Sequence, residues 1–103
     1  MRYEIVLSPE AVQDSRGLRA DLRARVRDAI ERHLRYEPTR TSRARIKRLR
    51  GRSRPLFRLR VGELRVFYDV VEGVVQILAM VAKSQAQAWL EELGESDEDR
   101  TSV

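Results

Sequence analysis

The chain has no cysteine among its 103 residues and contains only one histidine. The lack of cysteine excludes disulfides, thiolate metal ligands and cysteine nucleophiles. The single histidine, His33, has no second histidine with which to share a metal ion, so we expect neither a metal site nor another cofactor. Aromatic residues make up only 6% of the chain, whereas 42% of its residues are hydrophobic. This balance predicts one compact domain with a small, mostly aliphatic core.

Long apolar runs are also missing. No stretch approaches the roughly 20 consecutive apolar residues that a membrane-spanning helix needs. The first ten residues, MRYEIVLSPE, combine a short apolar run with charges throughout, which is not the pattern of a signal peptide. We therefore expect a soluble, cytoplasmic protein with no membrane partner.

Acidic residues are scarce in the middle of the chain. The formal net charge is +5, and every charged residue from Arg40 to Arg60 is positive. Residues 94–103, in contrast, hold four acids and one arginine. We predict a single domain over residues 1–93, followed by an acidic disordered tail over residues 94–103. A small basic domain favours an anionic partner, most often a nucleic acid.

The N-terminal half predicts one strand followed by two helices. Residues 2–7 alternate loosely between apolar and polar side chains, as in a short strand. Ser8 and Pro9 form a helix-start signal, and Gly17 is expected to interrupt that helix. Beyond the glycine, apolar residues recur at every fourth position, which indicates one buried helix face: Leu18, Leu22, Val26, Ile30 and Leu34. The helix is expected to end before Pro38.

The C-terminal half predicts an antiparallel meander and a final helix. In PLFRLRVGELRVFYDV, residues 55–70, apolar residues alternate with arginines on both sides of a tight glycine turn. VVQILAMVA, residues 74–82, is a nearly continuous apolar strand, which is typical of a central position. The motif SQAQ matches a capping box, so a last helix is expected from about Gln85 to Leu93. Together these elements predict an α+β fold with about four strands, a helical hairpin and a C-terminal helix.

This order of elements, together with RLRVGELRVFYDV at residues 58–70, resembles the RelE/ParE superfamily of toxins from type II toxin–antitoxin systems. The likeness extends over residues 2–93. It implies a RelE/ParE-like fold and a growth-inhibiting toxin that a cognate antitoxin binds in a hetero-oligomer. In the RelE branch, the toxin is a metal-independent mRNA endonuclease that acts on the ribosome and inhibits translation. In the ParE branch, a similar fold inhibits DNA gyrase and is not known as a nuclease.

The resemblance also gives roles to basic residues of this sequence. Arg58, Arg60 and Arg65 match the family's basic positions around the scissile phosphate. One planar guanidinium group can bind two phosphate oxygens at once, and its positive charge stabilises the negative charge that grows in the transition state. Arginine is a poor proton acceptor because its pKa lies above about 12. Lys83, at the end of the last strand, is therefore the fourth predicted catalytic residue and the candidate for proton transfer.

Three other residues have side chains capable of chemistry, but a structural role explains each of them better. Tyr68 alternates in phase with apolar neighbours and is expected to face the core. Trp89 shares helical spacing with Leu93, which favours packing over stacking on a base. His33 is expected on a helix surface.

Three functions stay open. The mRNA endonuclease, or mRNA interferase, comes first, with these further residues binding mRNA and ribosomal RNA through their charge: Arg43, Arg45, Lys47, Arg48, Arg50, Arg52 and Arg54. A non-enzymatic ParE-type toxin that binds gyrase or another protein comes second, because Ser84 stands where the resembling nucleases carry an arginine and no tyrosine follows it. The third is a catalytically degenerate member that binds a nucleic acid or an antitoxin.

Overall fold

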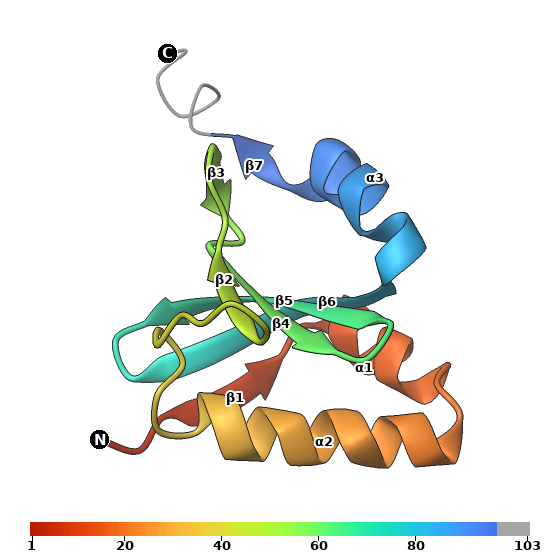
Figure 1. Ribbon diagram of the computed structural model, residues 1–103, viewed down its shortest axis with the longest axis horizontal. Coiled ribbons are helices and arrows are strands. Elements are labelled where there is room, and N and C mark those ends of the chain that lie inside the picture. The colour runs from red at the N-terminus through yellow and green to blue at the C-terminus, as the bar shows by residue number, and fades with distance from the viewer. Residues whose placement is uncertain (97–103) are drawn as a thin grey trace.

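The computed structural model describes residues 1–96, which form three helices and seven strands (Figure 1). In chain order the elements are β1 (Glu4–Leu7), α1 (Pro9–Arg16), α2 (Ala20–Leu34), β2 (Ile46–Arg48), β3 (Arg52–Arg54), β4 (Phe57–Val61), β5 (Leu64–Val71), β6 (Val74–Ala82), α3 (Lys83–Leu93) and β7 (Glu95–Ser96). None of these three helices is long and apolar enough to cross a membrane. β7 lies within the segment predicted to be a tail and pairs with β3, whereas residues 97–103 of that segment lie outside the described part of the chain.

The central sheet has the strand order β1-β6-β5-β4-β2. β1 runs parallel to β6, and the other neighbouring strands are antiparallel. A tight turn joins β4 to β5, and its Gly62 has a φ of 57°, a conformation that glycine adopts without strain. β1, β4, β5 and β6 are the strands that the sequence pattern predicts, so the α+β meander is confirmed. The short strands β2, β3 and β7 are additional.

The hydrophobic core lies between the sheet and the two N-terminal helices (Figure 1). The sheet contributes Leu59, Val66 and Tyr68, whose side chains are fully buried. The helix α2 contributes four residues of the predicted apolar stripe, of which Val26, Ile30 and Leu34 are buried and Leu22 is partly buried; Leu18, also partly buried, precedes the helix. The predicted break between the helices is confirmed at Gly17, which follows the last residue of α1. Burial of each large apolar side chain contributes about 1.5–3 kcal/mol.

The helix α3 lies on the opposite face of the sheet from α2 (Figure 1). The Trp89 ring stacks on Phe67 of β5, with ring centroids 4.8 Å apart and planes 7° apart. Phe67 is consequently fully buried, whereas Leu93 at the end of the helix is 64% exposed. The packing role predicted for Trp89 is confirmed. The aromatic pair covers part of this face of the sheet.

The start of α3 also differs from the prediction. The helix begins at Lys83, and its N-cap is Ala82, which makes no capping hydrogen bond with a side chain. The predicted capping box at Ser84 is therefore wrong. Instead, the Lys83 backbone N–H donates to the Glu63 carbonyl at 2.7 Å. A hydrogen bond between distant segments replaces the local cap and ties α3 to the turn between β4 and β5.

Candidate functional site

Three arginines share the face of the sheet that α3 partly covers. Alternation along β4 places Arg58 and Arg60 opposite the buried Leu59, and the strand register pairs Arg60 with Arg65 of β5. Residues directly opposite each other in an antiparallel pair point to the same face. Lys47 of β2 pairs with Arg58 and adds a further cation. We call Arg58, Arg60 and Arg65 the arginine cluster.

Arg65 is the most buried member of the arginine cluster, with an exposed fraction of 6%. Its Nη1 donates to the carbonyl oxygens of Gly62 and Leu64, at 2.8 Å and 3.0 Å. These bonds fix the guanidinium against its own turn, so Arg65 is less open to solvent than the alternating pattern suggested. Because neither carbonyl oxygen carries a full negative charge, these two hydrogen bonds do not neutralise the positive charge of Arg65.

Arg58 sits half-buried in the arginine cluster. Burial lowers the pKa of Arg58, and the neighbouring charges of Arg65 and Arg60 lower it further. The Arg58 Nε is buried and has no hydrogen-bond partner within residues 1–96. An unpaired buried donor costs about 1–3 kcal/mol, and more when the group is charged. The arginine cluster therefore holds repelling positive charges close together. A bound anion would lower the electrostatic energy of this arrangement.

Further cations surround the arginine cluster. Lys83 is exposed at the first position of α3, and its backbone bond to Glu63 holds it beside the turn that follows Arg60 and precedes Arg65. Lys47 and Arg50 line a hollow of about 490 Å³ whose remaining wall includes two residues of α3. The cationic face therefore continues from the cluster into a groove between β2 and α3.

The other predicted RNA-binding residues have diverse surroundings. Arg48 lies over the Phe57 ring, 5.8 Å from its centroid, and Arg54 Nε is 3.5 Å from the Asp69 Oδ2. Arg43 is exposed on the link before β2, and the side chain of Arg52 lies outside the described part of the structure. A cation–π contact therefore engages Arg48 and an ion pair engages Arg54, and the RNA-binding role of these basic residues stays a prediction.

Groups that transfer protons near neutral pH are scarce around the arginine cluster. Tyr68 faces the core, as predicted, and its hydroxyl donates to the Pro38 carbonyl at 2.6 Å. Burial raises the pKa of Tyr68, so its hydroxyl stays protonated. His33 lies on α2, on the other side of the sheet, where burial and the charges of Arg45 and Arg32 lower its pKa. Glu63, in the β4–β5 turn, and Lys83, whose backbone N–H donates to the Glu63 carbonyl, are both exposed.

Two features of the structure have no signal in the sequence. The stacking of Trp89 on Phe67 builds a wall beside the arginine cluster, but neither residue lies in a local motif that predicts the contact. On the other side of the sheet, the exposed Arg32 of α2 lines a pocket with residues that follow the helix. Only the path of the chain after Pro38 brings these residues together, and no spacing pattern encodes that path.

Comparison with protein families gives one match over most of the chain. A family model described as the ParE toxin of a type II toxin–antitoxin system, parDE, matches residues 5–94. The match includes the arginine cluster, Lys83 and all three helices. A comparison with curated protein sequences gives no significant match.

Solved structures similar to this chain include toxins and toxin–antitoxin complexes. The complex RelBE2 from Mycobacterium tuberculosis matches at 25% identity with a TM-score of 0.65, over 80% of this chain and 99% of that chain. The archaeal RelE–RelB complex from Pyrococcus horikoshii OT3 matches at 25% identity with a TM-score of 0.62, over 82% and 99%. Escherichia coli toxin RelE, as a double arginine-to-alanine mutant in the free state, matches at 20% identity with a TM-score of 0.66, over 88% and 94%. The predicted RelE/ParE-like fold is confirmed.

Proposed function

Because this chain belongs to the ParE toxin family of type II toxin–antitoxin systems, we propose that it inhibits growth by binding mRNA on the ribosome and cleaving it. In this proposal the arginine cluster holds the scissile phosphate. The protein acts in the cytoplasm, where translation takes place. The family match supports a toxin of a type II toxin–antitoxin system. That this toxin acts on mRNA is our proposal.

The observation that carries the proposal is the unbalanced charge of the arginine cluster. Arg58 is half-buried beside two other arginines, and its Nε has no partner within the described residues. A phosphate diester fits this surface because guanidinium nitrogens bind its oxygens in a planar, charge-assisted geometry. Burial strengthens that attraction because the surrounding protein screens charges less than water does.

The chemistry requires a 2′-hydroxyl to attack the adjacent phosphorus. A bond forms between the 2′ oxygen and phosphorus while the bond to the 5′ oxygen breaks, which leaves a cyclic phosphate and a free 5′-hydroxyl. The hydroxyl proton leaves the attacking oxygen, and the departing oxygen gains a proton. Arg58, Arg60 and Arg65 would stabilise the extra negative charge on the phosphorane. Lys83 is the candidate for carrying a proton, since it stands beside the β4–β5 turn.

A cognate antitoxin is the expected protein partner. Similar structures contain a RelE toxin together with a RelB antitoxin, and two of them share 25% identity with this chain. We propose that this toxin likewise forms a hetero-oligomer with an antitoxin. Co-expression with a small protein encoded beside it should restore growth and give a stable complex on size-exclusion chromatography.

A second candidate is a ParE-type toxin that binds DNA gyrase and has no nuclease activity. Two observations favour it: the matching family model describes ParE, and Ser84 stands where the resembling nucleases carry an arginine. In this candidate the arginine cluster and the cations around it bind gyrase through electrostatic attraction, and no bond is cleaved. Inhibition of gyrase supercoiling by the purified toxin would support it.

Primer extension on mRNA from induced cells separates the two candidates. The nuclease proposal predicts new 5′ ends within translated regions shortly after induction, and it predicts that Arg58→Gln removes both the new ends and the growth arrest. Supercoiling by gyrase should be unchanged at an excess of toxin. Growth arrest without new ends, and equally strong in Arg58→Gln, would refute the nuclease proposal.

A further inference from the structure

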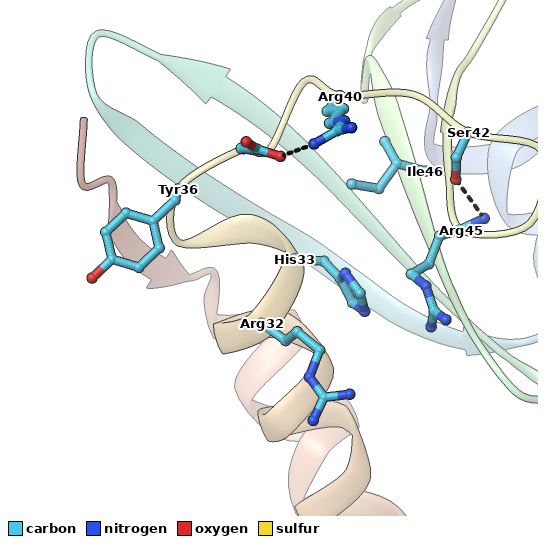
Figure 2. Close-up of a pocket in the computed structure, with 8 residues that line it drawn as sticks. Arg32, His33, Tyr36, Arg40, Ser42, Arg45 and Ile46 are labelled. Atoms are coloured by element: carbon cyan, nitrogen blue, oxygen red, sulfur yellow. Dashed lines mark hydrogen bonds and ion pairs between the residues drawn. The ribbon is translucent and has the colours of Figure 1, made fainter.

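A second cationic pocket lies on the side of the sheet where α2 packs. It is lined by Arg32, His33, Tyr36, Glu37, Arg40, Ser42, Arg45 and Ile46, and its volume is about 380 Å³ (Figure 2). We call it the α2–β2 pocket. Figure 2 shows the His33 imidazole between the side chains of Arg32, on the same helix, and Arg45, just before β2. The backbone of Arg45 is fixed by its N–H, which donates to the Ser42 hydroxyl at 3.1 Å.

The α2–β2 pocket has more positive than negative charge. Its one acidic residue, Glu37, is already paired with Arg40 at 2.9 Å. Within residues 1–96, the side chains of Arg32 and Arg45 form no ion pair with an acid. Two guanidinium groups therefore face the imidazole without a counter-charge. Such a site favours an anion with several acceptor oxygens.

The α2–β2 pocket continues toward the arginine cluster. An adjoining pocket of about 290 Å³ shares Arg32, His33 and Arg45 with it and also includes Arg60. The Arg60 N–H donates to the Arg45 carbonyl at 2.9 Å, which holds the two residues side by side at the edge of the sheet. Positive charge thus runs from the pocket past Arg45 and Arg60 to Arg58.

We propose that the α2–β2 pocket is a phosphate subsite for single-stranded nucleic acid whose backbone passes along the sheet edge to the arginine cluster. This inference rests on the proposed nucleic-acid function and extends it to residues of α2. A continuous positive groove that follows a backbone is the usual arrangement in proteins that bind single strands. Tyr36, which is 59% exposed and lines the pocket, offers an aromatic ring on which a base can stack.

His33 makes the occupancy of this subsite depend on pH. The charged groups around the imidazole are Arg25, Asp28 and Arg32 on α2, Glu37, Arg40 and Arg45 on the link to β2, and Arg60 on β4. In the free protein, burial and the charges of Arg45 and Arg32 lower the pKa of His33, so the ring is neutral at pH 7. A bound phosphate favours the imidazolium and raises that pKa. By linkage, the phosphate must bind more tightly as the pH falls.

His33 is the only histidine in the chain, so its ring proton resonance reports on this pocket alone. The probe is a short single-stranded RNA with 2′-O-methyl riboses, which has no free 2′-hydroxyl for cleavage. We expect the probe to raise the pKa of His33 and to bind roughly three- to tenfold more tightly at about pH 6 than at about pH 8. Arg45→Gln should abolish both effects. Arg16→Gln, an equal change of charge on exposed α1 surface, should keep both.

The outcomes separate this inference from the proposed function. If the probe binds and Arg58→Gln weakens it, but the pKa of His33 does not move, the subsite is refuted while phosphate binding at the arginine cluster stands. If the pKa of His33 rises with the probe and Arg58→Gln binds as tightly as the wild type, the subsite stands and the role of the cluster is refuted. No binding of the probe to the wild-type protein refutes the subsite.

Discussion

The two faces of the β4–β5 hairpin differ in burial and in charge, although alternate residues of the same two strands form them. On the α2 side, Leu59, Val66 and Tyr68 are fully buried in a core of aliphatic and aromatic side chains. On the α3 side, Arg58, Arg60 and Arg65 gather positive charge that no acid neutralises within the described residues. One face therefore stabilises the fold, while the other concentrates charge at an energetic cost. Removal of a core side chain should therefore lower the free energy of unfolding, whereas removal of an arginine of the cluster should not.

Removal of packing on the core face should have the largest effect on stability. Leu59→Ala deletes a fully buried side chain and leaves a cavity, so the free energy of unfolding should fall by about 2–5 kcal/mol. Urea denaturation measures the change. Val71→Ala, at a position that is 49% exposed, is the matched control and should cost less than about 1 kcal/mol. Equal losses in the two variants would contradict the assignment of the core face.

The aromatic pair on the α3 side should contribute less than the core. Trp89→Ala removes the ring stacked on Phe67 and should lower the free energy of unfolding by about 2 kcal/mol, because Trp89 is only partly buried. Trp89→Phe keeps an aromatic ring and should recover part of that loss. Intrinsic tryptophan fluorescence of the wild type provides an independent readout, since Trp89 is the only tryptophan. An unchanged unfolding free energy in Trp89→Ala would show that α3 is not held by this contact.

The hydroxyl of Tyr68 should have a smaller effect that depends on pH. Tyr68→Phe leaves the buried Pro38 carbonyl without its hydrogen bond and should cost about 1 kcal/mol at neutral pH. Burial raises the pKa of Tyr68 in the folded state, so above about pH 10 the unfolded chain loses the phenol proton first. The free energy of unfolding of the wild type should therefore fall with rising pH more steeply than that of Tyr68→Phe. Tyr36→Phe, at an exposed position, should follow the wild type.

Local patterns predicted much of the fold because they depend on residues close in sequence. The i+4 stripe of α2 and the alternation in β4 and β5 require only that apolar side chains share one face. They also place Arg58, Arg60 and Arg65 together, since a two-residue turn fixes the strand register. For these elements the hydrophobic pattern and the structure agree.

Features that depend on contacts between distant segments were not predicted. The start of α3 relies on a hydrogen bond from Lys83 to Glu63, so the local capping signal at Ser84 was misleading. β6 contains an irregularity opposite Phe67 and Tyr68, where Leu78 is left without a partner in the register. The Ser8 hydroxyl donates to the Leu78 carbonyl at 2.9 Å. The approach of Arg45 to His33 likewise depends on the path of the link after α2, which no periodicity encodes.

We expect the arginine cluster to bind phosphate at some expense of stability. The most direct test of this expectation is the affinity of purified wild type and Arg58→Gln for a 2′-O-methyl single-stranded RNA at one fixed, low salt concentration, with the unfolding free energy of both proteins measured alongside. We predict that Arg58→Gln binds at least about tenfold more weakly, because it loses a charge-assisted contact, and that it is no less stable than the wild type. Equal affinities, or a variant that loses stability as Leu59→Ala does, would contradict this expectation.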